Sequence, residues 1–433
     1  MRGLCGFGRR NSIGTVFCAF PGSANCCSSL ESPINAASLA ITGSGQDIAL
    51  YTQVNNVGTF SAINGTGAVM FQNGSGPLSV GTVTGGYAYL QAAGAISQSG
   101  AISATTLSIG GSGQAIALGT QANSIGTFNV SNGSGAVAIK DATGELAIGY
   151  AYTGPLNITA AGKVSISQVI AAGTIGIVTP GSLYVGPAGS PTPLLQSSTL
   201  IDLTRVDGDI VLANGGLIVA PSVQTGGKPI QIAGIDSVAA LNSAVSLVNS
   251  QSSASGLTYQ LTVLQSLVLT QTLIVSNPII LQGITPSTTI YGSSGVPNGL
   301  YLTGAANGST IRDIAFGSFA GGTAVTLNAV KNVLMSNVAV GNSTNGLYIT
   351  GDSTGTSILS NRFVANQTGI SLVAATNVTV GGLSSGSNSV SYSARAAVFA
   401  SGYCTGSQVL KTLMINNTVD YDVSAARNLT IVK

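Results

Sequence analysis

The chain has 433 residues, of which 59 are glycine and only 26 are charged, with a formal net charge of +2 and with neither histidine nor tryptophan. Soluble domains usually carry roughly 25% charged residues, so Ser, Thr, Asn and Gln must supply most of the polar surface here. So small a charge, with no cluster of Lys and Arg, disfavours nucleic-acid binding, and the lack of histidine excludes a Ser-His hydrolase site.

Residues 1–36 differ in composition from the rest of the chain. They hold Arg2, Arg9 and Arg10, then an apolar stretch over 13–20, then small residues over 21–24. This order is typical of a secretory signal, and the alternative is an unstructured or wrongly started N-terminus. We therefore predict a leader or disordered segment over 1–36. Four of the five cysteines lie between Cys5 and Cys27, so no disulfide framework is expected in the body.

Residues 37–232 contain an internal repeat. The stretch 43–81 aligns without a gap with 111–149, at a constant offset of 68 in residue number and with 21 of 39 positions identical. Short alternating segments such as Leu78-Ser-Val80, separated by Asn-Gly turns, are typical of strands with one buried face. Repetition at a fixed period predicts a solenoid, here with three coils of about 22 or 23 residues per repeat. Prolines over 179–196 predict a loop excursion.

Residues 233–253 carry a helical pattern, and Asp236 or Ser237 is expected to cap its N-terminus. The apolar positions share one face, namely Val238, Leu241, Val245 and Val248. Two placements are open: a cap over the end of a second solenoid segment, or a helical loop on the side of one continuous solenoid. The best candidate for a membrane span, 261–281, is uncharged but is interrupted by polar residues, so we expect no integral membrane segment.

Residues 254–433 carry a different repeat, in which the glycines at 322, 346 and 369 recur at spacings of 24 and 23. An asparagine at the same place in each coil can form a ladder whose amides bond to neighbouring coils. We predict such a structural ladder from Asn337, Asn361, Asn388 and Asn416. The sequence ends in a strand-like segment, which we interpret as truncation of a longer array of repeats.

These segments resemble two known groups. The GSGQ-IAL unit, with its connector over 93–110, resembles filamentous-haemagglutinin-like and autotransporter-type bacterial adhesins. The pattern of Gly369-Ile-Ser-Leu and Asn361-Arg-Phe-Val-Ala-Asn366 resembles the repeats of pectate-lyase-like proteins. The resemblances imply an all-β, right-handed parallel β-helix, in one run or in two stacked segments with the helix between them. They also imply an extracellular or bacterial cell-surface location, with a separate translocator for outer-membrane export.

Asp207 and Asp209 are the best candidates for chemistry. On a strand they would share a face about 6.8 Å apart, close enough to bind one calcium ion or to act as an acid–base pair. Gly208 between them favours the alternative, a turn with solvated carboxylates. Four tyrosines are candidates for a sugar-stacking strip, with scattered surface residues as the alternative: Tyr87, Tyr89, Tyr150 and Tyr152.

The sequence thus predicts a structural and adhesive protein rather than an enzyme, with no catalytic residues, cofactor or bound metal. Its partner would be a surface glycan or a protein ligand, which the sequence does not identify. The alternative is a β-helix polysaccharide lyase or hydrolase, or a carbohydrate-binding module. The sparse charged residues disfavour the enzyme, because acid–base catalysis needs positioned titratable groups.

Overall fold

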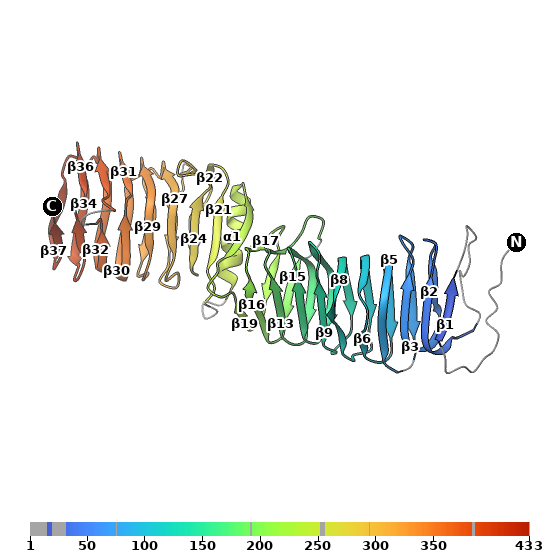
Figure 1. Cartoon of the computed structure of the whole chain (residues 1–433). Coiled ribbons are helices and arrows are strands. Elements are labelled where there is room, and N and C mark those ends of the chain that lie inside the picture. The colour runs from blue at the N-terminus through green and yellow to red at the C-terminus, as the bar shows by residue number, and fades with distance from the viewer. Residues whose placement is uncertain are drawn as a thin grey trace. The chain divides into compact units, whose positions relative to one another are not determined.

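The computed structural model describes residues 15–19, 32–74, 76–190, 193–251, 256–293, 295–382 and 386–432. They form a parallel β-solenoid of about 18 turns (Figure 1). The predicted all-β parallel β-helix is therefore confirmed. The chain divides into two compact units, Met1–Lys228 and Pro229–Lys433, which we call the first and the second unit.

The described strands of the first unit pair only in parallel. They are β1 (Thr15–Ala19), β2 (Asn35–Thr42), β3 (Ile48–Ile63), β4 (Val69–Asn73), β5 (Leu78–Ala92), β6 (Ile96–Gln98), β7 (Ile102–Gly110), β8 (Ile116–Ser131), β9 (Val137–Asp141), β10 (Leu146–Thr153), β11 (Leu156–Ala160), β12 (Val164–Ala171), β13 (Ile175–Thr179), β14 (Leu183–Val185), β15 (Leu194–Ser197), β16 (Leu200–Val206), β17 (Ile210–Leu212), β18 (Leu217–Val219) and β19 (Ser222–Gln224).

Each coil turns its apolar side chains inward, because alternate residues of a strand point to opposite faces. Leu78 lies beside Ile96 and Ile96 beside Ile116 in successive coils, and all three are buried. Phe60 and Phe71 stack in the interior with ring centroids 4.1 Å apart. Burying each such side chain contributes about 1.5–3 kcal/mol, so the columns of inward residues hold the coils together.

The two copies of the repeat lie in different strand columns. One column runs from Ile48 through Val69 and Ala88 and reaches Leu107 after three turns. Its counterpart Ile116 stands in another column, beside Val137 of the next coil. Leu107 precedes Ile116 in the chain, so three turns are shorter than one repeat. The prediction of three coils per repeat is wrong, because these coils are shorter than expected.

The second unit continues with parallel strands and the helix α1 (Val238–Ser250). Its strands are β20 (Ile230–Ile235), β21 (Tyr259–Val263), β22 (Leu267–Leu269), β23 (Leu273–Val275), β24 (Ile279–Gly283), β25 (Thr289–Gly292), β26 (Asn298–Leu302), β27 (Thr310–Gly317), β28 (Thr323–Asn328), β29 (Leu334–Gly341), β30 (Asn345–Leu359), β31 (Arg362–Val364), β32 (Thr368–Val380), β33 (Ser389–Ser391), β34 (Ala396–Tyr403), β35 (Gln408–Leu410), β36 (Leu413–Ile415), β37 (Tyr421–Arg427) and β38 (Thr430–Val432).

Helix α1 lies against the coil of β21, β22 and β23 in the second unit. Ser237 caps it, since the Ser237 Oγ accepts the Ala240 N–H at 3.1 Å. The helix contacts β20 and all three strands of that coil, β21, β22 and β23. Its buried face holds Leu241, Val245 and Val248. The two placements that the sequence left open, a cap over the end of a second solenoid segment and a helical loop on the side of one continuous solenoid, both stay predictions.

The segment 1–36 falls partly inside the solenoid. Residues Thr15–Ala19 form β1, which pairs in parallel with β2, whereas the sequence predicts a leader or disordered segment there. The last two residues of the predicted segment, 35 and 36, begin β2, and residues 1–14 and 20–31 lie outside the described residues. In the described part of the chain, no helix has the length and hydrophobicity that a membrane crossing requires.

Candidate functional site

Two tyrosines of β10 stand side by side on an outward face of the first unit. Tyr150 and Tyr152 alternate with Ala151, whose side chain is buried. Each tyrosine is 39% exposed, and their ring centroids lie 5.9 Å apart with an interplanar angle of 30°. The strand therefore presents a pair of aromatic rings to solvent in a defined arrangement.

A β-bulge at Gly149 sets the position of this pair. The register between β10 and β8 shifts between Ile148 and Tyr150, and the Tyr150 N–H donates to Asn129 Oδ1 at 3.1 Å. A Cβ at position 149 would lie 2.2 Å from the same oxygen, so a side chain there requires Asn129 to move. Glycine is thus the residue that lets the bulge form and aims the tyrosines outward.

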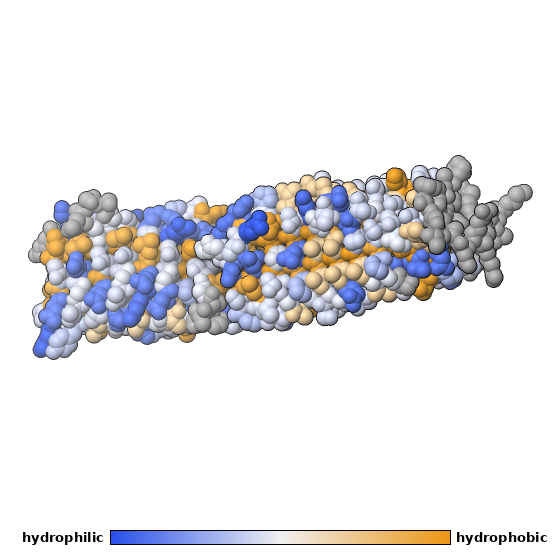
Figure 2. All heavy atoms as spheres, turned by 60° about the horizontal axis from the view of Figure 1, so that its bottom comes forward, coloured by the Kyte–Doolittle hydropathy of each residue, from blue (hydrophilic) through white to orange (hydrophobic). Residues whose placement is uncertain are grey.

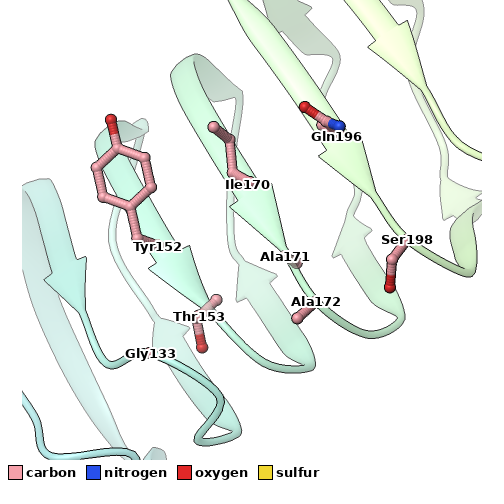
Figure 3. Close-up of a pocket in the computed structure, with 8 residues that line it drawn as sticks. All are labelled: Gly133, Tyr152, Thr153, Ile170, Ala171, Ala172, Gln196 and Ser198. Carbon is pink, nitrogen blue, oxygen red and sulfur yellow. The ribbon is translucent and has the colours of Figure 1, made fainter.

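Tyr152 lies at the edge of an open hollow that spans three coils (Figure 3). In the strand register Tyr152 pairs with Ile170 of β12, and Ile170 pairs with Gln196 of β15. The hollow has a volume of about 360 Å³ and is lined by these residues, Thr153, Ser198 and small residues of the adjoining turns. Three coils therefore contribute to one concave surface.

The lining of the hollow is uncharged. Apolar surface comes from the Tyr152 ring and Ile170, and polar groups come from the Gln196 amide and the Ser198 hydroxyl. The Tyr152 hydroxyl donates a hydrogen bond to Gln168 Oε1, on the next coil. This bond restricts rotation of the tyrosine side chain, so the ring is held in place before any ligand arrives.

The first copy of the repeat carries threonines at the matching positions. Continued past residue 149 at the same offset of 68, the comparison of the two copies matches Tyr150 with Thr82 and Tyr152 with Thr84. The backbone is equivalent there: the Tyr152 carbonyl accepts the Asn132 N–H at 2.8 Å, and the Thr84 carbonyl accepts that of the matching asparagine at 2.9 Å. The same bulge precedes both pairs. The scaffold therefore accepts either residue type at these positions.

Tyr87 and Tyr89 of β5 do not join this pair. Tyr89 shares a column with Tyr150, but Ser108 and Asn129 occupy the two coils between them. The Tyr89 hydroxyl donates to Gln91 Oε1 at 2.8 Å. Burial raises the pKa of Tyr89, and electrostatic repulsion from Tyr87 and Tyr150 adds to that rise. The four tyrosines form one close pair and a separate group rather than a continuous strip.

Hydrophobic surface by itself does not mark a site on this molecule. On the face that Figure 2 shows, hydrophobic residues reach the surface in narrow bands between hydrophilic ones. Single exposed apolar side chains are normal on soluble proteins. What distinguishes the Tyr150–Tyr152 pair is that a hollow with polar groups adjoins it.

Asp207 and Asp209 lie on a turn, not on a strand. They flank Gly208 between β16 and β17, and both are exposed. The Lys228 ammonium donates to the carbonyl oxygens of Val206 at 2.5 Å, of Asp207, and of Gly208 at 3.4 Å. A positive charge therefore already lies against this turn. Among the described residues, no group of three or more His, Cys, Asp and Glu side chains is placed to hold a metal ion.

Asn361 and Asn388 are stacked in the interior of the second unit. Asn361 Nδ2 donates to Asn388 Oδ1 at 3.1 Å, and Asn361 Oδ1 accepts the Val338 N–H at 3.0 Å. Asn388 Nδ2 in turn donates to the Ile358 carbonyl at 2.7 Å. Each amide thus connects neighbouring coils, as the ladder predicted from the sequence requires.

Asn337 and Asn416, which the sequence places in the same ladder, are outside it. Both are exposed and have positive φ, 53° and 51°. Asn337 Nδ2 donates instead to Asp313 Oδ1 at 2.6 Å. Asparagine tolerates the left-handed conformation of tight turns, so sequence spacing did not separate turn asparagines from buried ones.

Other asparagines make the coil-to-coil bonds that these two do not. Asn366 and Asn417 each accept a backbone N–H of the preceding coil at 3.0 Å. Asn55 and Asn123, which occupy matching positions of the two repeat copies, do the same at 2.9 Å. The signal that identifies the last two is their retention in both copies.

No family model matches the chain, and no curated protein or solved structure matches it. The resemblances that the sequence carries therefore rest on the quoted repeats alone. The candidate site is defined by its own geometry.

Proposed function

We propose that the protein is adhesive and presents a stiff β-solenoid for attachment to surfaces, cells or matrix. The observation that carries this proposal is the exposed pair of Tyr150 and Tyr152 beside an open, uncharged hollow. Aromatic side chains offer a large contact area with few rotatable bonds, so they lose little entropy on binding. Held by a regular scaffold, such a surface favours binding without chemical turnover.

The proposal includes a location outside the cell or on the bacterial surface, with export by a separate translocator. Its support is the resemblance of the repeated GSGQ-IAL unit to filamentous-haemagglutinin-like adhesins. Attachment through many weak contacts suits this setting, because linking several copies multiplies a low affinity through effective concentration.

We further propose that the protein has no polysaccharide lyase or hydrolase activity. Acid–base catalysis needs two positioned groups whose environments separate their pKa values. Asp207 and Asp209, the closest candidates, are exposed on a turn beside Lys228. A carbohydrate-binding module is the second candidate function, which the aromatic hollow favours.

The test uses the full chain, displayed in many copies on beads. We expect the beads to attach to glycan-coated or cell surfaces far better than the free protein does. A variant with Asp207→Asn and Asp209→Asn should attach equally well, and neither protein should release reducing ends or unsaturated products from polysaccharides. Product release that the double variant loses would favour the enzyme instead.

A further inference from the structure

We infer that the hollow beside Tyr152 binds an uncharged saccharide, with a sugar ring against the Tyr150–Tyr152 pair. The inference rests on the proposed adhesive function and names the ligand class of that site. Four observations support it: the departure from the repeat, the mixed lining, the neutrality of the lining and the fixed Tyr152 ring.

The fold does not need the two tyrosines. The first copy of the repeat builds the same bulge and the same backbone hydrogen bond with Thr82 and Thr84. Replacing these threonines by Tyr150 and Tyr152 leaves two aromatic rings each 39% exposed. Apolar surface left in water does not stabilise the folded state, so the exposed part of each ring is free for contact with a ligand.

The lining matches the two-sided chemistry of a sugar. A sugar ring has an apolar C–H face and a rim of hydroxyl groups that both donate and accept hydrogen bonds. The Tyr152 ring and Ile170 supply apolar contact, while the Gln196 amide and the Ser198 hydroxyl offer both donors and acceptors. A purely apolar ligand would leave these two polar groups without partners and lose their hydrogen bonds with water.

The absence of charge in the lining selects a neutral sugar. None of the residues that line the hollow is Lys, Arg, Asp or Glu. A uronate or sulfated sugar would give up hydration of its anionic group without gaining a cationic partner. A neutral sugar has no such cost.

Size and rigidity fit a small ligand bound weakly. A volume of about 360 Å³ lies near the lower end for ligand pockets. The hollow is open to solvent, so a longer chain can extend beyond it. The hydrogen bond from Tyr152 to Gln168 fixes the ring in advance, which reduces the ordering cost of binding.

The experiment measures binding of neutral and anionic tetrasaccharides to the full chain by calorimetry and saturation-transfer NMR. The neutral probes are β-linked glucose and N-acetylglucosamine tetramers, and the anionic probe is tetragalacturonate. We expect a neutral probe to bind with a Kd on the order of 1 mM. Tyr150→Thr with Tyr152→Thr should weaken it on the order of tenfold. Because these are the residues of the first repeat copy, the variant should melt with the parent.

Two further variants keep the test sharp. Gln196→Ala should weaken binding by removing hydrogen bonds without touching the rings. Tyr51→Thr alters another exposed tyrosine, remote from the hollow in the register of the coils, and should bind like the parent. Unchanged binding by the double tyrosine variant, or tighter binding of tetragalacturonate than of the neutral probes, would overturn the inference. If coated beads attach but no neutral sugar binds, the inference fails and the adhesive function stands. If neither occurs, both fail.

Discussion

One difference between the repeat copies places a carboxylate in the solenoid interior. Asp141 occupies the position of Asn73, and each accepts a backbone N–H at 2.8 Å, from Ile125 and from Val57 respectively. Asp141 is only 1% exposed, and its burial raises the pKa of its carboxyl although two backbone N–H groups act to lower it. The substitution keeps the shape of the side chain and adds a charge that burial disfavours.

Asp141→Asn is therefore expected to raise the free energy of unfolding at pH 7. The native pKa lies above the unfolded value of about 3.9, so the folded state holds the proton more tightly and stability falls as pH rises between the two values. Asparagine does not titrate, so the stability of the variant does not fall in this way. The difference in free energy of unfolding between the variant and the parent should therefore narrow as the pH is lowered toward about 4. Urea unfolding at both pH values measures this. The reverse change, Asn73→Asp, should introduce the same pH dependence; a parent more stable than Asp141→Asn at pH 7 would contradict the argument.

Asn361→Leu is expected to destabilise the second unit. It leaves the Val338 N–H and the Met335 carbonyl, which now accepts from Asn361 at 2.9 Å, without partners in a buried site. Each unsatisfied group costs about 1–3 kcal/mol. The control is Asn345→Leu, because Asn345 is only partly buried and donates to one threonine hydroxyl. Denaturant unfolding should separate the two variants, and equal midpoints would argue against a structural role for Asn361.

At the scale of the element, α1 supplies hydrogen bonds where a strand would otherwise pair. Asn249 Nδ2 donates to the Ile274 carbonyl, and Asn249 Oδ1 accepts the Ser276 N–H, both at 2.8 Å. Asn277 Nδ2 donates back to the carbonyls of Val248 and Gln251, each at 2.7 Å. The helix thus satisfies backbone groups of the coil formed by β21, β22 and β23. An exposed strand edge would offer such groups to other chains.

Asn249→Ala should lower stability by about 1–2 kcal/mol, since two backbone groups at β23 lose their partners but remain near solvent. It should also increase aggregation on mild heating, because β23 then offers a free edge. Ser246→Ala, on the exposed side of the same helix, is the matched control. Thermal melting followed by light scattering compares them; a variant that aggregates no faster than the control would show that the hydrogen bonds of Asn249 are dispensable.

At the scale of the whole molecule, charge contributes little to cohesion. The side-chain ion pairs found among the described residues are Lys163–Glu145 at 2.8 Å, Lys331–Asp352 at 2.7 Å and Arg395–Asp422 at 3.9 Å, all with solvent-accessible side chains. Such surface pairs are worth about 0–1 kcal/mol each. Buried apolar columns and backbone ladders carry the stability instead.

The melting temperature should therefore hardly change when NaCl is raised from about 0.05 M to about 0.5 M, a range over which exposed pairs become screened. Sodium sulfate at the same ionic strength is the comparison, because it strengthens apolar burial and should raise the melting temperature. A marked loss of stability in NaCl would instead show that ionic contacts matter more than their exposure indicates.

Much of this fold could be predicted from short-range patterns. The alternation in segments such as Leu78-Ser-Val80 indicated the strands, the repeat indicated the solenoid, and the spacing of apolar residues indicated α1. The length of individual coils could not be predicted, because turns of different length close equivalent coils. The turn from Tyr152 to Ile170 is shorter than the next turn, from Ile170 to Gln196. The lengths of these two turns bring Ile170 and Gln196 into line with Tyr152. The sequence therefore indicated the tyrosines as candidates but not the residues that line the hollow beside them.

The offset between repeat copies has a consequence for how such a molecule changes length. The repeat is not a whole number of turns long, so the second copy is rotated about the solenoid axis relative to the first. Ile48 and Ile116 therefore enter different columns. Both columns accept the same inward residues, so a copy of the repeat can fold in either column. A copy gained or lost by unequal crossing-over then need not span a whole number of turns. Each event also turns a copied surface feature toward a new direction around the solenoid axis.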